Sequence, residues 1–179
     1  MKGDRKKMGN ILTVYFSRKG ENYWGGTLKN LSKGNTEIVA ETVHKAVGGD
    51  LFQVETARAY SDDYQTCTEE AQKELDENAR PELKKYMDSL DGYDTVFVGF
   101  PNWWGTMPMA MFAFLERYDL KGKRIIPFCT NEGSGMGNSV EDLKKLCAGA
   151  VVEEGLSVRG SESEKSGSKV SAWARKMTN

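Results

Sequence analysis

Histidine is nearly missing from this sequence, which has a single one, His44, among 179 residues. This scarcity excludes histidine-rich metal sites and the usual Ser-His and Cys-His catalytic pairs. His44 itself lies near Glu41 and Lys45 on the polar side of an expected helix, so we predict a solvated side chain rather than a catalyst. The protein is therefore expected to take its chemistry from a cofactor, and we nominate no catalytic residue and no metal ligand.

Cysteine is also sparse. Cys67, Cys129 and Cys147 are an odd number, lie far apart, and include no Cys-x-x-Cys pair. Neither a disulfide framework nor a zinc site is indicated by such spacing. We expect three reduced thiols.

Long apolar runs and a strong net charge are both lacking. No stretch could span a bilayer, and 28% of the residues are charged. Residues 1–9, MKGDRKKMG, are basic but lack the apolar run of a secretory signal, so we expect a loose tail and a cytoplasmic protein. With 25 basic and 26 acidic residues the net charge is −1, which predicts neither nucleic acid nor membrane as a partner.

The rest of the chain, residues 10–179, is of a size that suits one domain with one core. β-Branched and aromatic runs alternate with segments of helical periodicity. Strands are expected at 10–16, 51–54, 95–100, 124–129 and 155–159. Helices are expected at 35–47, from Asp62 or Asp63 to 78, and at 82–90, 106–118, 139–147 and 168–177, with 160–168 a loop. Such alternation predicts an α/β fold whose parallel sheet is covered on both faces.

The helix expected at 106–118 is apolar nearly all round. Most helices of this kind are buried, although an exposed face could make a dimer or partner contact. Its large apolar residues are Met107, Met109, Met111, Phe112 and Phe114.

Ligands of open parallel sheets bind outside the carboxyl ends of the strands, which selects the loops at 17–36, 101–107 and 130–138. The first loop reaches a helix start, where free N–H groups and the helix dipole favour a phosphate. Ser17 and Thr36 supply hydroxyls there, and Asn35 supplies an amide. The plainer interpretation is that Asn35 or Thr36 only caps its helix.

The second loop contains adjacent tryptophans, Trp103 and Trp104. Both rings cannot enter the same core, so at least one is expected to face solvent, a ligand or a partner. The alternative places one ring under the sheet and the other over apolar surface. The third loop contains glycines that let backbone approach a ligand, but its spacing is not that of a dinucleotide fingerprint.

Together, YFSRKG…GNTE, FVGFPNWWGTMP and FCTNEGSGMG resemble the flavodoxin family, and most closely a bacterial branch with a GENY-type insertion in the first loop. The resemblance covers the chain from Asn10 onward and implies a flavodoxin-like five-stranded sheet of order 2-1-3-4-5 with bound FMN. The implied phosphate contacts are Ser17, Arg18, Lys19, Gly34, Asn35 and Thr36. The implied ring contacts are Pro101, Asn102, Trp103, Trp104 and Gly105, with Thr130, Asn131, Glu132, Gly133, Ser134 and Gly135 along the pyrimidine edge.

The first loop departs from the family pattern Ser-x-Thr-Gly-Asn-Thr. Lys19-Gly20 and Lys33-Gly34 each match its Thr-Gly, and both carry lysine in place of the hydroxyl. The sequence leaves this register open. The residues between them include Tyr23 and Trp24, which either shield the flavin or pack the insertion against the protein.

A bound FMN leads us to expect an FMN-dependent oxidoreductase that passes electrons from a nicotinamide or a reductase to a small acceptor. The alternative is a flavodoxin-type carrier between proteins, but such carriers are usually strongly acidic and this chain is not. A phospho-receiver domain would need aspartates where Ser17 and Asn102 stand, so we set that class aside. A homodimer is compatible with the sequence.

Overall fold

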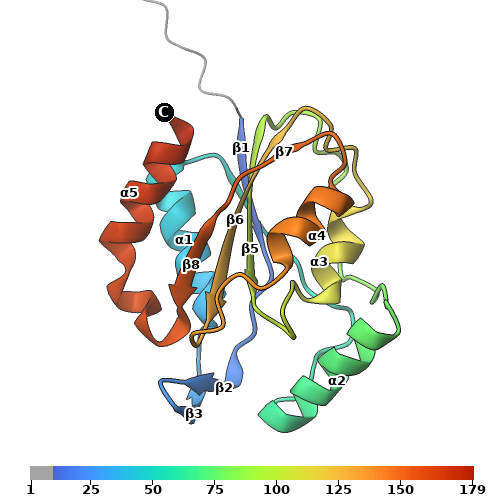
Figure 1. Ribbon diagram of the computed structural model, residues 1–179, viewed down its shortest axis with the longest axis vertical. Helices are drawn as coiled ribbons and strands as arrows, with labels where there is room; N and C mark the ends of the chain where they lie inside the picture. Colours follow the sequence, from blue (N-terminus) through green and yellow to red (C-terminus); the bar gives the residue numbers. More distant parts are fainter. Residues whose placement is uncertain (1–9) are drawn as a thin grey trace, which may run out of the picture.

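A parallel sheet forms the centre of the protein, as the computed structural model of residues 10–179 shows (Figure 1). The expected tail, residues 1–9, lies outside the described residues. The strands run in the order β4-β1-β5-β6-β7, and β8 also pairs with β6. Their bounds are β1 Ile11–Tyr15, β4 Asp50–Gln53, β5 Thr95–Pro101, β6 Arg124–Asn131, β7 Val151–Val152 and β8 Leu156–Arg159. The predicted α/β fold and the 2-1-3-4-5 order are confirmed.

The last position of the sheet is divided between two strands, where the sequence predicted one at 155–159. Val151 pairs with Arg124, whereas Leu156 pairs with Phe128 further along β6. Between these pairings lies Pro127, which has no N–H to donate to a ladder. Gly155 passes close to it, since a Cβ there would lie 2.3 Å from the Pro127 carbonyl oxygen. The edge strand therefore interrupts its pairing at the proline.

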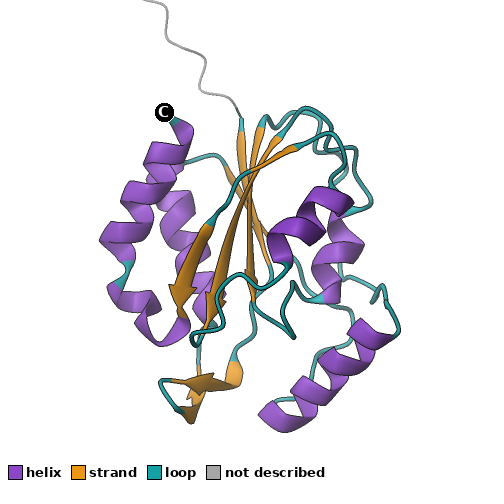
Figure 2. Cartoon of the chain, viewed as in Figure 1, coloured by secondary structure: helices purple, strands orange, loops and turns teal. Residues whose placement is uncertain are grey.

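Helices cover both faces of the sheet (Figure 2). On one face lie α1, Asn35–Val47, and α5, Gly167–Thr178; on the other lie α3, Met109–Leu115, and α4, Ser139–Leu146. Successive residues of β1 enter opposite cores, because side chains alternate along a strand. Leu12 and Val14 pack towards α3, while Ile11 and Tyr15 pack towards α1 and α5. No helix among residues 10–179 is long and apolar enough to cross a membrane.

The helix predicted at 82–90 was wrong. This segment is irregular, with bends at Lys84 and Asp88 and with Leu83 in an isolated antiparallel bridge to Thr56. The Lys84 N–H donates to the Glu55 carbonyl at 2.9 Å. Leu83 and Leu90 are buried without a helix. Backbone pairing with a distant segment, after the interruption at Pro81, therefore overrides the local helical pattern.

The helix predicted at 106–118 is shorter, because Thr106 is engaged in a bridge with Trp103. Pro108 precedes the first helical residue, and α3 ends at Leu115. The buried interpretation of this helix is confirmed. Met107, Met109, Met111 and Phe114 are buried, and Phe112 packs against the same core.

Three further elements lie around the carboxyl ends of the strands (Figure 1). The insertion, expected to be a loop, is an antiparallel hairpin of β2, Gly20–Trp24, and β3, Thr27–Leu31, which turns at glycines with φ of 60° and 94°. Helix α2, Tyr64–Asp76, begins as predicted at Asp63, which accepts from the Thr66 N–H at 2.8 Å. The expected loop at 160–168 contains a 3₁₀ helix, η1, Gly160–Lys165.

The predictions for the cysteines and for the histidine have different outcomes. The three cysteines are free and buried, so reduced thiols are confirmed. His44 was wrongly expected to be solvated: it is half-buried, and its Nδ1 has no hydrogen-bond partner among the described residues. Position 44 lies one turn from the buried Ala40 and Val47, at the margin of the helix face that packs on the sheet.

Candidate functional site

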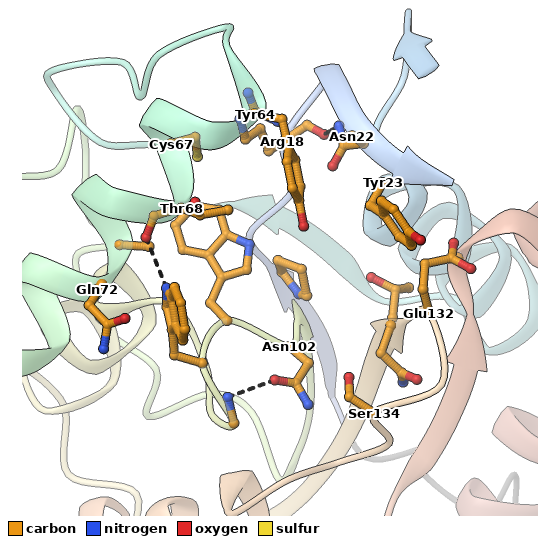
Figure 3. Close-up of a pocket in the computed structure, with 18 of the residues that line it drawn as sticks. Arg18, Asn22, Tyr23, Tyr64, Cys67, Thr68, Gln72, Asn102, Glu132 and Ser134 are labelled. Carbon is orange, nitrogen blue, oxygen red and sulfur yellow. Dashed lines mark hydrogen bonds between the residues drawn. The ribbon is translucent and has the colours of Figure 1, made fainter. Parts of the chain in front are cut away.

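A cavity of about 1020 Å³ opens at the carboxyl ends of the strands (Figure 3). All three predicted loops contribute to it. The predicted residues that line it are Ser17, Arg18, Asn35, Thr36, Pro101, Asn102, Trp103, Trp104, Gly105, Thr130, Asn131, Glu132 and Ser134. Lys19, Gly34, Gly133 and Gly135 are not among its lining residues. Lys19 and Gly133 are exposed, Gly34 is buried, and Gly135 is partly buried.

The start of α1 carries the features of an anion site. Its N-cap is Gly34, and the Ser17 hydroxyl oxygen accepts from the Glu37 N–H at 3.0 Å. The N–H groups of Asn35 and Thr36 donate no hydrogen bond within the described part of the chain. Because Ser17 caps by accepting, its hydroxyl hydrogen stays available for donation. Two free amides, one hydroxyl and the positive end of the helix dipole therefore meet at the cavity wall.

The structure distinguishes the two candidate glycines, because Gly34 and not Gly20 lies at the start of α1. Gly34 lies against Ser17 and Arg18, since a Cβ on it would be 2.1 Å from Ser17 Oγ. Gly20 instead begins the hairpin with φ of 90°. The interpretation in which Asn35 or Thr36 caps its own helix was wrong, because Gly34 holds that position and Ser17 provides the cap.

A buried hydroxyl pair joins the first loop to the third. Thr36 Oγ1 and Thr130 Oγ1 lie 2.7 Å apart, and both residues are nearly inaccessible to solvent. One donates to the other, so neither polar atom is left unsatisfied. The bond fixes the start of α1 against the end of β6.

We expect Thr36→Val to lower the free energy of unfolding by about 1–3 kcal/mol, because the Thr130 hydroxyl would stay buried without a partner. The double variant Thr36→Val/Thr130→Val replaces both hydroxyls by methyl groups and should be much closer to wild type. Urea unfolding of the wild type, the two single variants and the double variant measures this coupling. Additive losses in the double variant would contradict it.

Asn102 joins the second loop to the third. Its Nδ2 donates to the Gly135 carbonyl at 2.8 Å, and its Oδ1 accepts from the Gly105 N–H at 2.9 Å. Asn131 holds the third loop in turn, accepting from the N–H groups of Gly133 and Gly135 at 2.9 and 3.0 Å. The two asparagines therefore shape this wall of the cavity through backbone atoms.

The two tryptophan rings differ in exposure, and one of them is accessible, as the sequence predicted. Trp103 packs edge-on against Phe16 and Tyr60, with ring centroids 5.1 and 5.0 Å away. Trp104 is 50% exposed, and its Nε1 donates to the Thr68 carbonyl of α2 at 2.9 Å. Trp103 is thus a fixed wall of the cavity, and Trp104 presents an accessible ring at its edge.

Glu132 serves to position η1. Its two carboxylate oxygens accept from the Ser161 N–H at 2.9 Å and the Ser161 hydroxyl at 3.2 Å. Gly160 leaves room for this contact, because a Cβ there would lie 2.5 Å from Asn35 Nδ2 and 3.0 Å from Glu132 Oε1. The third loop, η1 and the start of α1 therefore meet at one point.

Sequence reasoning missed the α2 side of the cavity. The lining residues not predicted as contacts include Tyr64, Gln65, Cys67, Thr68 and Gln72 on α2, with Asn22 on the hairpin and Gly160 on η1. Of the two aromatic residues expected either to shield the flavin or to pack the insertion, Tyr23 lines the cavity and Trp24 is not among its lining residues. Tyr64 points into the cavity in Figure 3. Burial raises the pKa of Tyr64, so its hydroxyl stays protonated and can donate. The helix itself was predicted, but nothing in its sequence indicated that it faces the loops.

Arg18 ties the hairpin to the start of α2. Its guanidinium donates to the Glu21 carbonyl, to the Ser61 carbonyl at 2.7 Å and to the Asp62 carbonyl at 3.0 Å. The Glu21 carboxylate in turn accepts from the Tyr64 N–H at 3.0 Å. The side chain of Arg18, rather than its backbone alone, thus shapes the cavity.

Cys67 lines the cavity as a protonated thiol, since burial raises its pKa to about 11. We expect alkylation by iodoacetamide to be slow at pH 7 and to rise about tenfold per pH unit towards pH 10, because the thiolate is the nucleophile. Mass spectrometry of the Cys67 peptide measures the rate. Cys129 and Cys147, which lie outside the cavity lining, are internal controls. A rate that is flat above pH 8 would contradict the raised pKa.

The flavodoxin family model matches residues 29–177. The chain belongs to the flavodoxin family. A crystal structure of a candidate flavoprotein from Bacteroides eggerthii is 30% identical, covering 95% of this chain and 98% of that one, with a TM-score of 0.74. A second, from Bacteroides uniformis, is 28% identical, covering 94% and 99%, with a TM-score of 0.72. No match is found among curated proteins.

A third flavodoxin-like structure, of a flavoprotein in complex with FMN from Lactobacillus acidophilus, is 20% identical, covering 88% and 97% with a TM-score of 0.61. At this identity the likeness concerns the fold. In the present chain, the letters GENY are the first four residues of β2, so this insertion is a hairpin at the cavity rather than an irregular loop. Membership of a GENY-type branch stays a prediction.

Proposed function

We propose that residues 10–179 form one domain that binds FMN in this cavity and transfers electrons as an FMN-dependent oxidoreductase. The observation that carries the proposal is the start of α1, where the amides of Asn35 and Thr36, which have no partner among residues 10–179, adjoin the Ser17 hydroxyl on the wall of an aromatic-lined cavity. A phosphate ester with a planar ring system fits both features. The FMN in the Lactobacillus acidophilus flavoprotein supports this choice.

Residues of each loop have a separate task in this proposal. The Asn35 and Thr36 amides and the Ser17 hydroxyl would hold the phosphate. Trp103, fixed by Phe16 and Tyr60, would form an apolar wall for the rings. The third loop, from Thr130 to Gly135, would offer backbone groups to the polar ring edge, since its own turn is already held by Asn131. When bound, FMN supplies one- or two-electron transfer.

An enzyme is favoured over a protein-to-protein carrier by the size of the cavity and by charge. A cavity of about 1020 Å³ is at the upper end of small-molecule sites, which run to roughly 1,000 Å³, so there is room beside a cofactor. The net charge of −1 gives little steering towards basic partners. A nicotinamide or a reductase would supply the electrons, and a small molecule would accept them. The electron carrier is the alternative.

Stepwise reduction of the purified, FMN-loaded protein in a spectrophotometer tests the proposal. We expect the visible flavin bands to bleach on addition of NADH or NADPH, or of a reductase with its nicotinamide, and to return with a small acceptor. A stabilised one-electron species under chemical reduction, with no turnover of small acceptors, would favour the carrier. Failure of the colourless protein to take up FMN in calorimetry would refute both.

A further inference from the structure

Tyr60 and Glu74 form a hydrogen-bonded pair that has no task in the proposed function. The Tyr60 hydroxyl donates to a Glu74 carboxylate oxygen at 2.6 Å, a distance at which a base can take up the proton. Burial raises the pKa of Tyr60, and the hydrogen bond to Glu74 raises it further. Burial also raises the pKa of Glu74, which makes its carboxylate a stronger base. The pair therefore holds a protonated phenol against a carboxylate of increased basicity.

The ring of Tyr60 touches a wall of the cavity proposed for FMN. It meets Trp103 edge-on, with ring centroids 5.0 Å apart and an interplanar angle of 89°. Phe16 packs edge-on against both rings, with centroids 5.1 Å from Trp103 and 6.0 Å from Tyr60. Rings at such distances are in direct contact, so an electron can pass between Trp103 and Tyr60 without an intervening group.

The pair faces away from the cavity proposed for FMN. Trp103 lines that cavity, whereas Tyr60 and Glu74 line a second cavity of about 460 Å³. The other charged residues that line the second cavity are Arg58, Glu70 and Glu82. Arg58 and Glu82 are exposed, so this cavity opens to solvent. A proton that reaches Glu74 is therefore delivered outside the FMN cavity.

We infer that Tyr60 and Glu74 form a proton-coupled redox site that reduces Trp103 after a one-electron oxidant in the cavity has oxidised it. The Tyr60 ring gives one electron to the Trp103 radical cation, and the Tyr60 hydroxyl proton moves to Glu74. The products are neutral Trp103, a neutral tyrosyl radical and a carboxylic acid, so charge and electrons balance. The oxidant is light-excited oxidised flavin, for which the inference rests on the proposed function. When the reduced oxidant returns its electron to Tyr60 and Glu74 returns the proton, the pair is restored and Trp103 is not left oxidised.

Flash photolysis of the FMN-loaded protein, followed by transient absorption, tests the site without turnover. In the wild type we expect a tryptophan radical that is replaced by a tyrosyl radical. In Tyr60→Phe the tryptophan radical should persist and the tyrosyl radical should be lost, because phenylalanine is not oxidised in its place. Glu74→Gln should form the tyrosyl radical at least about tenfold more slowly, since the amide does not take up the proton. Circular dichroism and titration with FMN check that each variant is folded and loaded.

Two control variants match these changes. Tyr93→Phe removes a hydroxyl that also donates to a carboxylate, that of Asp50 at 2.5 Å, but at the amino ends of the strands. Glu70→Gln removes a carboxylate one turn before Glu74 on α2, which accepts from the Ser61 N–H at 2.9 Å. We expect both controls to form the tyrosyl radical like the wild type.

The inference is overturned if wild type and Tyr60→Phe give equal tyrosyl radical yields, because the radical then comes from Tyr23 or Tyr64 on the lining of the FMN cavity. It is also overturned if Glu74→Gln keeps the wild-type rate, or if the wild type forms no tyrosyl radical. Glu74→Gln alone decides if Tyr60→Phe does not fold. If the wild type takes up no FMN, the proposed function fails. Pulse radiolysis of the FMN-free protein, with azide radicals to oxidise tryptophan, then decides the redox site by the same comparison of variants.

Discussion

Gly34→Ala is expected to abolish most FMN binding. The added Cβ would lie 2.1 Å from Ser17 Oγ, 2.7 Å from the Arg18 carbonyl oxygen and 2.9 Å from the Arg18 carbonyl carbon. Two of these atoms are backbone, so the exit of β1 and the start of α1 must move apart. Gly34 has φ of −65°, which alanine adopts freely, so the effect is one of space alone.

Moving the exit of β1 away from the start of α1 should both weaken FMN binding and lower the free energy of unfolding. Each charge-assisted hydrogen bond to the phosphate that is lost costs about 1.5–3 kcal/mol, so loss of one or two predicts about a hundredfold weaker FMN binding. Overpacking of this kind costs about 1–3 kcal/mol of folding free energy. Calorimetry with FMN and thermal unfolding measure the two effects.

Gly167→Ala is the matched control. Gly167 is the first residue of α5, and a Cβ on it would meet no atom of the described residues within 4 Å. We expect this variant to bind FMN like the wild type and to be at least as stable, because alanine favours a helix over glycine. If Gly34→Ala binds FMN as tightly as Gly167→Ala does, the phosphate is not held at the start of α1.

The sheet could be predicted because its strands are encoded locally. Ile11–Tyr15, Thr95–Pro101 and Arg124–Asn131 are apolar runs that end at polar or glycine-rich loops, and each is buried in the centre of the sheet. The error at 82–90 has the opposite origin. There the partner of Leu83 is Thr56, far back in the chain, and a local periodicity carries no information about such pairing.

The candidate site likewise has a part that could be predicted from the sequence and a part that could not. The three loops followed from the rule that ligands bind at the carboxyl ends of parallel strands, and the structure brings Ser17, Asn102 and Thr130 to one cavity. The α2 wall could not be predicted, because a polar connection gives no sign of the surface it covers. Its position depends on Arg18 and Glu21, whose contacts are with backbone atoms and leave no pattern in the sequence.

Arg18→Met should loosen this wall. Methionine keeps an unbranched apolar stem but donates nothing, so the carbonyls of Glu21, Ser61 and Asp62 lose a shared charged donor. Hydrogen bonds to charged groups contribute about 1.5–3 kcal/mol each, with the lower figure appropriate to partly exposed carbonyls. We expect hydrogen exchange to accelerate in the hairpin and at the start of α2, and FMN affinity to fall about tenfold.

Two further variants distinguish the positioning role of the Arg18 side chain from the effect of its positive charge. Arg18→Lys keeps the positive charge, but its ammonium cannot span three carbonyls. The backbone amides of the hairpin and of the start of α2 should therefore exchange their hydrogens almost as fast in Arg18→Lys as in Arg18→Met. Arg175→Met removes an exposed arginine near the end of α5 and should change neither exchange at the cavity nor FMN affinity. If Arg18→Lys instead restored wild-type exchange and affinity, Arg18 would act through its charge, as a direct attraction for the phosphate. Unchanged exchange in both Arg18 variants would show that the Glu21 carboxylate on the Tyr64 amide is sufficient to hold the hairpin against α2.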